Sequence, residues 1–248
     1  MLLHVHQLSL ALDGRPVLQG LDFTLATGEV VGVVGPNGAG KTSLLRTLAG
    51  LLRAAAGEIE LDGKPLFARH PQERARLVGY LPQFPRLEWP LPVREAVALG
   101  RRALGLADVA DAEVDAALAR FELTALAQTD ATRLSGGEQM RVHLARLAAG
   151  EHQVLLVDEP TASLEPRHQL QVLAQLRELA RGGCAILMVL HDLALAARYC
   201  DRVLVLANGH QQAVGAPQEV LGERLLEEIF RVRGERDAAG SLSGLREL

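Results

Sequence analysis

The sequence predicts an α/β fold: a mostly parallel sheet, an N-terminal antiparallel β part and an inserted α-helical subdomain. Short apolar runs at 30–34, 154–157 and 185–189 have the length and the continuous Val, Ile and Leu content of strands buried on both faces. Segments with helical spacing separate the later runs, as in βαβ units. Between about 92 and 150 only helical spacing is found, which indicates the insertion.

The elements before the insertion follow from alternation and from turn residues. Residues 2–12 and 17–25 alternate between apolar and polar, with Asp13-Gly14 between them, which predicts an antiparallel hairpin. Four further elements are each bounded by Gly, Pro or Asp: a strand at Val30–Val34, a helix at Thr42–Ala49, and strands at Glu58–Leu61 and Leu77–Leu81.

Within the insertion, apolar residues share one face of each expected helix. They are Val93, Ala96, Val97 and Gly100, then Val114, Ala117, Leu118 and Phe121, and finally Met140, Leu144 and Leu147 over about 136–149. Strands and helices then alternate again: strands at Val154–Val157, Ala185–Val189 and Val203–Leu206, and helices at about 167–180 and 192–199.

The domain organisation predicted from these elements is one domain over 1–232, with its helical subdomain at about 85–150. Residues 233–248 are rich in Gly, Ser and charged residues, so we expect them to form a flexible tail.

Composition restricts the function classes. The 248 residues include 26 Lys and Arg against 30 Asp and Glu, a net charge of −4, and only 3% are aromatic. Nucleic-acid binders need a basic surface or stacking aromatics, so we expect no nucleic acid partner. Cys184 and Cys200 lack metal-ligand spacing and are expected to be reduced.

No segment is expected to enter a membrane. The longest apolar runs, 30–35 and 184–190, are far shorter than the ~20 residues that span a bilayer. The N-terminal MLLHVHQLSLAL has no Lys or Arg before its apolar residues, so a secretory signal is not expected. We therefore expect a soluble chain whose work at a membrane, if any, depends on another subunit.

A glycine-rich loop follows the first buried strand and precedes a helix. It matches the pattern G-x-x-x-x-G-K-[ST] in full, with Gly35, Pro36, Asn37, Gly38, Ala39, Gly40, Lys41 and Thr42, and Ser43 comes next. Its N–H groups and the helix N-terminus suit phosphate oxygens. Lys41 is expected across the β- and γ-phosphates, and Thr42 on Mg²⁺. An ordinary glycine-rich turn is the alternative, but the lysine and the flanking strand favour a phosphate-binding loop.

Two adjacent carboxylates end the strand at 154–157. Asp158 is expected to hold Mg²⁺, usually through water, and Glu159 to orient or deprotonate the attacking water. A strand that runs into a solvated acidic turn is the alternative. The phosphate loop elsewhere in the chain favours the catalytic interpretation.

A third motif lies between these two and opens a helix: Leu134, Ser135, Gly136, Gly137 and Glu138. Taken alone, the motif is explained by Ser135 capping the helix. In this order, however, the three motifs resemble the ATP-binding subunit of ABC transporters, whose signature sequence matches Leu134–Glu138. The resemblance extends to about residue 230 and implies a P-loop NTPase core.

The resemblance also implies roles for two residues that would not stand out alone. Gln83 matches the Q-loop, and His191 matches the switch histidine. Taken singly, Gln83 is explained as a surface loop residue, and His191 as a residue at a capped strand end. In the family, Glu159 is the general base, His191 contacts the γ-phosphate, and Gln83 senses it. The magnesium ligands that we carry over to this sequence are Thr42, Gln83 and Asp158.

A head-to-tail dimer with two sandwiched ATP molecules is a further implication. Lys41 and Thr42 of one subunit would face Ser135 and Gly137 of the other across each γ-phosphate, since the signature turn is a second helix N-terminus. One phosphate loop per chain implies a homodimer or a heterodimer with a similar subunit. The expected partners are ATP, that subunit, a transmembrane permease and, indirectly, a substrate-binding protein, at the cytoplasmic face of the inner membrane.

Among ABC ATPases, the chain most resembles importer subunits for metal chelates, namely ferric siderophores, haem and cobalamin. The segments Tyr80–Gln83, Val93–Arg101 and His191–Arg202 carry this resemblance. Leu87–Pro90 is similar instead to zinc and manganese importer ATPases, which remain an alternative.

Other classes of ATP-binding protein are less compatible with the sequence. DNA-repair members of the superfamily carry long coiled-coil insertions, but no sustained heptads separate Lys41 from Leu134. Translation members usually have two nucleotide-binding domains in one chain. A module that binds ATP without hydrolysing it would not need Glu159 and His191.

Two positions depart from the family pattern. Glu165 ends the segment after the catalytic glutamate, where the family more often has Asp. Leu12 stands where many members carry an aromatic that stacks on adenine. Apolar contact selects a base less strictly, so we expect loose selectivity between ATP and GTP.

Residues 84–102 begin the helical part and should form a groove for a helix of the membrane partner. Leu87, Trp89 and Leu91 are candidate anchors in this groove. Local packing inside the helical subdomain explains the same residues equally well.

Overall fold

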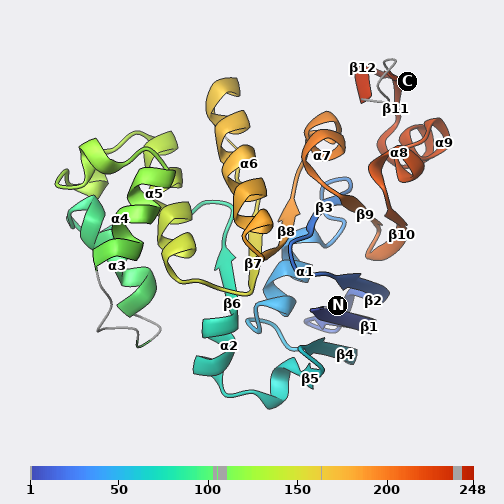
Figure 1. The fold of residues 1–248 in the computed structure, drawn as a ribbon. Coiled ribbons are helices and arrows are strands. Elements are labelled where there is room, and N and C mark those ends of the chain that lie inside the picture. Colours follow the sequence, from blue (N-terminus) through green and yellow to red (C-terminus); the bar gives the residue numbers. More distant parts are fainter. Residues whose placement is uncertain (1, 103–104, 106–110, 163, 237–241) are drawn as a thin grey trace.

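The computed structural model describes residues 2–102, 105, 111–162, 164–236 and 242–248. Helix α1 (Lys41–Leu48) packs between two sheets, and a lobe of helices lies to one side of them (Figure 1). Of the described helices, none has the length and apolar character needed to cross a bilayer.

The N-terminal sheet is antiparallel and has the order β2-β1-β4-β5. Its strands are β1 (Leu3–Leu12), β2 (Arg15–Leu25), β4 (Ala56–Leu61) and β5 (Lys64–Pro65). The expected hairpin is confirmed, with Leu3 opposite Leu25 and Leu12 opposite Arg15. Asp13 and Gly14 both adopt positive φ, the conformation that a tight two-residue hairpin turn requires.

The second sheet has the order β10-β9-β3-β8-β7-β6 and is parallel except for β10. Its strands are β3 (Val30–Val34), β6 (Val78–Leu81), β7 (Val154–Asp158), β8 (Ala185–Val189), β9 (Arg202–Ala207) and β10 (His210–Gly215). Strands β3, β7 and β8 are buried at every position, which explains their unbroken apolar sequences. The edge strand β10 lacks an apolar run and was not predicted.

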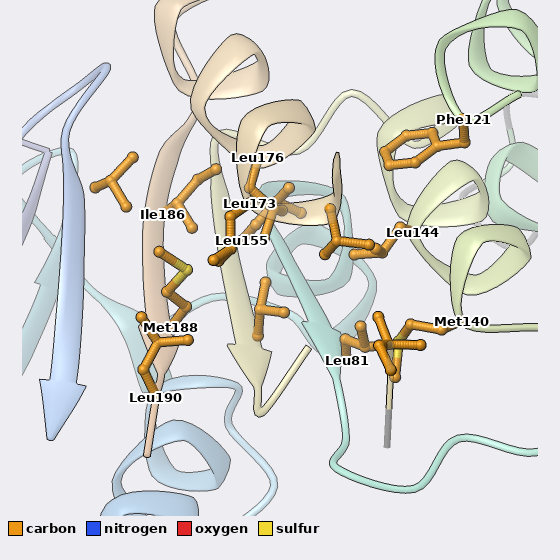
Figure 2. Close-up of a cluster of buried hydrophobic side chains, with 14 of the residues drawn as sticks. Leu81, Phe121, Met140, Leu144, Leu155, Leu173, Leu176, Ile186, Met188 and Leu190 are labelled. Atoms are coloured by element: carbon orange, nitrogen blue, oxygen red, sulfur yellow. The ribbon is translucent and has the colours of Figure 1, made fainter. Parts of the chain in front are cut away.

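Helices cover the face of this sheet that is turned away from α1. Two of them are α6 (Pro166–Arg181) and α7 (Leu193–Tyr199). Figure 2 shows Leu155 and Ile186 of the sheet against Leu173 and Leu176 of α6, with Leu144 of the helical lobe nearby. Alternate strand residues point to the opposite face and pack on α1 in a second core cluster.

The helical lobe contains α3 (Val93–Arg102), α4 (Asp111–Arg120) and α5 (Gly136–Ala149), while α2 (Pro71–Leu77) lies before β6. Helix α5 has the predicted bounds. A Cβ at Gly100 would lie 2.1 Å from the Arg146 carbonyl oxygen, so α3 and α5 approach closely only because this residue is glycine. Arg101 is buried and donates to the Ala149 carbonyl over 2.7 Å, which ties α3 to the end of α5.

Described parts of the segment that was expected to be a flexible tail form paired strands. After α8 (Pro217–Val220), α9 (Glu223–Leu225) and a π-helical turn (Leu226–Phe230), strands β11 (Val232–Arg236) and β12 (Leu242–Glu247) pair antiparallel. Leu242 is buried and belongs to the core cluster that includes Leu193 of α7. Leu242 therefore attaches the described strand β12 to the core.

Candidate functional site

The glycine-rich loop joins the end of β3 to the start of α1. A Cβ at Gly35 would lie 2.0 Å from the Leu206 carbonyl oxygen, and Gly40, with φ 98°, has the left-handed conformation that favours glycine. Gly40 is the residue before α1 and offers no side-chain cap. The first N–H groups of α1 are therefore left for a ligand, and a helix N-terminus favours an anion.

Lys41 is buried at the first position of α1. Its Nζ donates to the carbonyl oxygens of Gly35 over 2.7 Å and of Pro36 over 2.9 Å. Burial lowers the pKa of Lys41, while the charges of Glu159 and Asp158 oppose this shift. The ammonium group is thus held inside the loop, where a phosphate oxygen would be a stronger partner than either carbonyl.

The acidic residues lie at the end of the neighbouring strand β7. Asp158 is fully buried, and neither carboxylate oxygen has a hydrogen-bond partner among the described residues. Burial raises the pKa of Asp158, whereas the nearby Thr42 hydroxyl and the charges of Arg46 and Lys41 act in the opposite direction. An unpaired carboxylate at this depth is costly, which indicates a site built to receive a positive partner.

Glu159 follows with φ 51°, a strained conformation for a residue other than glycine, and it precedes a proline. Its two carboxylate oxygens hydrogen-bond to different partners: Gln83 Nε2 donates to Oε2, and His191 Nε2 pairs with Oε1. These three residues follow β6, β7 and β8, which are adjacent and parallel. The carboxyl ends of parallel strands share one edge, so the sheet brings the three side chains together.

A cavity of about 690 Å³ lies in front of this edge, within the size range of small-molecule sites. Its lining residues are Val17, Asn37, Gly38, Ala39, Gly40, Lys41, Thr42, Ser43, Gln83, Glu159 and His191. The structure therefore gathers most of the predicted site residues around one space. Val17 was missed because its place in an alternating strand suggested only packing, and Leu12 is not among the lining residues.

The signature residues lie elsewhere in the described structure. Ser135 caps α5 in a capping box: its Oγ accepts from Glu138 N–H over 3.4 Å, and the Glu138 carboxylate accepts from Ser135 N–H over 2.9 Å. A Cβ at Gly136 would meet nothing within 4 Å. None of the residues Leu134–Glu138 lines the cavity. Within one chain, the two helix N-termini do not meet at one site.

Magnesium binding can be judged from the donor atoms. The unpaired Asp158 carboxylate and the adjacent Thr42 hydroxyl are hard oxygen donors, the type that Mg²⁺ prefers. No group of three or more His, Cys, Asp or Glu suited to a metal occurs among the described residues. Mg²⁺ commonly uses one or two carboxylates with substrate phosphates, so these residues fit it. Gln83, by contrast, is engaged with Glu159.

Replacing Asp158 by Asn tests the cost of the buried charge. Without nucleotide, the variant is expected to be more stable by about 1 kcal/mol, which raises Tm by about 2 to 4 °C at pH 7.5. Because the folded-state pKa of Asp158 is raised, its favourable contribution is present at low pH and is lost as the pH rises through that pKa. The gain should therefore shrink at pH 4.

Thermal unfolding with and without Mg²⁺ and ATP measures both effects. The Asn variant should also lose the extra stabilisation that Mg²⁺ adds to ATP. Asp13→Asn, at an exposed position in the turn after β1, is the matched control. A lower Tm for Asp158→Asn at pH 7.5 would contradict the buried-charge interpretation.

A phosphate-binding loop that opposes the acidic end of an adjacent parallel strand defines a P-loop nucleoside triphosphatase. Helices are inserted between β6 and β7, and the last of them begins at a capped Ser-Gly-Gly turn. These two features narrow the choice among families of P-loop nucleoside triphosphatases. The chain belongs to the ABC transporter family, whose profile matches residues 18–162.

Individual relatives agree with this assignment. The hemin import ATP-binding protein HmuV of Streptomyces coelicolor is 46% identical over 222 residues, which cover 88% of this chain and 79% of that protein. HmuV of Pseudomonas entomophila is 44% identical over 237 residues and covers 93% of both chains. Among solved structures, cbiO1 of Clostridium perfringens, part of the ABC transporter complex cbiONQ, matches with a TM-score of 0.81 and 29% identity, covering 91% of this chain and 94% of that one.

An ATP binding subunit of an ABC transporter matches with a TM-score of 0.80 and 30% identity, covering 89% of this chain and 92% of that one. The predicted fold class and family resemblance are confirmed. The chain is an ATPase that is coupled to transport.

Proposed function

We propose that this chain powers an importer for haem or a related iron complex, as a Mg²⁺-dependent ATPase homodimer bound to a permease at the cytoplasmic face of the inner membrane. One observation supports the dimer above all. The cavity of one chain contains Lys41, Glu159 and His191, but its own signature turn lies outside that cavity. The relatives named for hemin import favour haem as the cargo.

Hydrolysis of ATP in this site follows from the residues around the cavity. The N-terminus of α1 and Lys41 would bind the phosphates. Asp158 and Thr42 would hold Mg²⁺, which neutralises charge on the phosphates when it is bound. Glu159 would orient and deprotonate the attacking water, while His191 fixes one of its oxygens. Gln83 holds the other oxygen and would report the state of the site to the permease.

The signature turn would complete the site of a second copy. Ser135 and Gly137 stand at the N-terminus of α5, whose free N–H groups can approach the γ-phosphate of the partner's ATP. The open space around the Gly136 Cα leaves room for that approach. ATP would then bind the closed dimer better than the open one, and its hydrolysis would release the closure.

The segment after Gln83 supports a permease contact. Trp89 is 71% exposed and Phe84 69%, so two large apolar side chains close together in sequence are mostly open to solvent. Leu87, in contrast, packs against the core cluster and so favours the packing interpretation. We assign Trp89 as the anchor for a partner helix, and Leu87 as support beneath it.

Trp89→Ala is expected to uncouple transport from ATP hydrolysis. Loss of an interface anchor typically costs about 2 kcal/mol or more, so transport by the reconstituted complex should fall at least about tenfold. Basal ATPase activity of the free chain should change less than about twofold. Leu51→Ala, at a position 62% exposed in another part of the surface, is the control. Equal losses of both activities would favour a packing role for Trp89.

The cargo is identified by reconstituting this chain in vesicles with the permease and the substrate-binding protein that neighbouring reading frames encode. Vesicles containing the full complex should accumulate haem only when ATP is inside with this chain. Ferric siderophore, cobalamin and zinc are presented separately at the same concentration. If the vesicles take up zinc and none of the other compounds, the zinc and manganese importer alternative replaces the haem proposal. If no transport genes lie nearby, the non-transport classes of ABC ATPase become the alternative.

Base selectivity provides a further expectation. Val17 lines the cavity, and Leu12, which precedes it in the same hairpin, is 39% exposed. Contact of these residues with the base would be apolar rather than aromatic. ATP and GTP should therefore be hydrolysed with kcat/KM values within about tenfold of each other. Leu12→Tyr should increase the preference for ATP. A strong adenine preference in the unmodified chain would contradict this expectation.

A further inference from the structure

The turn that follows Glu159 is held by a side chain from the next helix. Its described residues are 160–162 and 164, and α6 begins two residues after Leu164. Gln169 is half-buried in the first turn of α6. Its Nε2 donates to the Leu164 carbonyl over 3.0 Å and to the Thr161 carbonyl over 3.3 Å. One side chain therefore binds two backbone acceptors of this turn.

Helix capping does not account for a glutamine at this position. An N-terminal cap must accept from the free N–H groups of the helix, whereas the Gln169 amide donates. The Gln169 backbone N–H already bonds to the Glu165 carbonyl, as in any helical turn. The two N–H donors of a side-chain amide match the two carbonyls of the turn. An apolar side chain of similar length would fill the same space and leave both carbonyls without this partner.

The same turn fixes the backbone of Glu159. The Glu159 carbonyl accepts from Ala162 N–H over 3.1 Å, and the Thr161 carbonyl accepts from Leu164 N–H over 3.3 Å. The second of these carbonyls is one that Gln169 binds. Glu159 itself has φ 51°, and a strained conformation persists only where the surrounding structure holds it. Gln169 thus supports the hydrogen-bonded turn that keeps the Glu159 backbone in place.

The far end of the turn packs beside the signature turn. Leu164 is 9% exposed and belongs to the same core cluster as Leu134. A Cβ at Gly137 would lie 3.4 Å from Leu164 Cδ2, which is van der Waals contact. The clamped turn therefore reaches from the catalytic carboxylate to the signature turn of the same chain.

We propose that Gln169 is a positioning residue for Glu159, which it holds by clamping the turn after Glu159 to α6. The inference rests on the proposed role of Glu159 in hydrolysis. Gln169 does not line the nucleotide cavity, so its loss should lower kcat and leave KM for ATP unchanged. Loss of both hydrogen bonds corresponds to a fall in kcat of about three- to tenfold, since water replaces part of them at a half-buried site.

Three substitutions of Gln169 separate hydrogen bonding from packing. Gln169→Met keeps the length and removes the donors, and kcat should fall about three- to tenfold. Gln169→Glu places acceptors opposite the two carbonyls, so kcat should fall further. Gln169→Lys keeps N–H donors and should recover at least half of the original kcat. Equal losses in all three variants would show a packing role and overturn the proposal. Gln175→Met, farther along α6, is the matched control and should leave kcat within about twofold.

A double-mutant cycle shows whether Gln169 acts through Glu159. In a Glu159→Gln background, followed with radiolabelled ATP because turnover is slow, Gln169→Met should lower the residual rate by less than about twofold. The same fold-loss in both backgrounds would overturn the proposal. If Glu159→Gln by itself leaves kcat unchanged, the proposed role of Glu159 fails instead.

Hydrogen exchange tests the clamp independently of hydrolysis. The amides of Ala162 and Leu164 donate within the turn, so without nucleotide they should exchange at least about fivefold faster in Gln169→Met than in the unmodified chain. Gln169→Lys should restore their protection, and Gln175→Met should not change it. Two-dimensional NMR measures these amides individually. Exchange rates at Ala162 and Leu164 that are equal in the Met variant and the unmodified chain would show that Gln169 does not hold the turn.

Discussion

Glu159→Gln should reduce ATP hydrolysis by about a thousandfold while leaving ATP binding intact, because positioned general bases typically contribute about 10² to 10⁴ in rate. The amide keeps the size of the side chain and can still hydrogen-bond to the groups that surround it. It cannot accept the proton of the attacking water. The phosphate-binding groups are left in place, since Lys41 bonds to the loop carbonyls and not to Glu159.

Trapped ATP should also change the oligomeric state. If ATP joins two subunits, the Glu159→Gln variant with ATP and Mg²⁺ should shift from a 26.6 kDa monomer to a particle of about twice that mass. Light scattering after size-exclusion chromatography measures this, with steady-state phosphate release as the activity assay. Glu178→Gln, on the exposed surface of α6, is the matched control. Monomers that persist in saturating ATP would overturn the sandwich dimer.

Lys41→Ala should weaken ATP binding about a hundredfold or more and abolish measurable hydrolysis. A charge-assisted bond to phosphate in a buried site contributes about 1.5 to 3 kcal/mol, and the loop would also lose the cation that offsets Asp158 and Glu159. The variant should still fold, because burial of the Lys41 ammonium group without a ligand costs free energy that burial of alanine does not cost. Titration with a fluorescent ATP analogue and thermal unfolding measure the two quantities.

The only other lysine in the sequence provides the control for this change. Lys64 is exposed on the short strand β5, and Lys64→Ala should leave binding and hydrolysis within about twofold. An unfolded Lys41→Ala chain would show that the lysine maintains the loop itself. In that case Lys41→Arg, which keeps the charge, distinguishes loss of the loop from loss of the phosphate contact.

Most of the fold could be predicted because its signals are local. The five-residue strands β3 and β8 and the helix α5 have the predicted bounds, since a continuous apolar run and a capped helical period are each visible within a few residues. Strand β10 and the pairing of β11 with β12 escaped prediction. Their stability comes from one edge contact with β9 and from burial of Leu242, and neither is encoded by periodicity.

For the candidate site, too, residues within a local motif could be predicted, and residues brought together from distant segments could not. The glycine loop, Lys41 and the carboxylates after β7 could be predicted from the sequence, because their chemistry depends on neighbouring residues. Gln83 and His191 were recognised only through resemblance to the family. Val17 was not recognised at all, because an isolated valine in a strand has no distinctive pattern.

For this protein, the amino-acid sequence by itself determined the phosphate loop, the acidic strand end, the capped signature helix and the order of these motifs. All four depend on backbone conformation and hydrogen bonds between residues close in the chain. The tertiary structure alone decided that Gln83, Glu159 and His191 meet, and that the signature turn stays outside the cavity of its own chain. The order of the parallel strands brings Gln83, Glu159 and His191 together, and the placement of the helical lobe keeps the signature turn away from them. Both arrangements join segments that are far apart in sequence, so local sequence does not encode them.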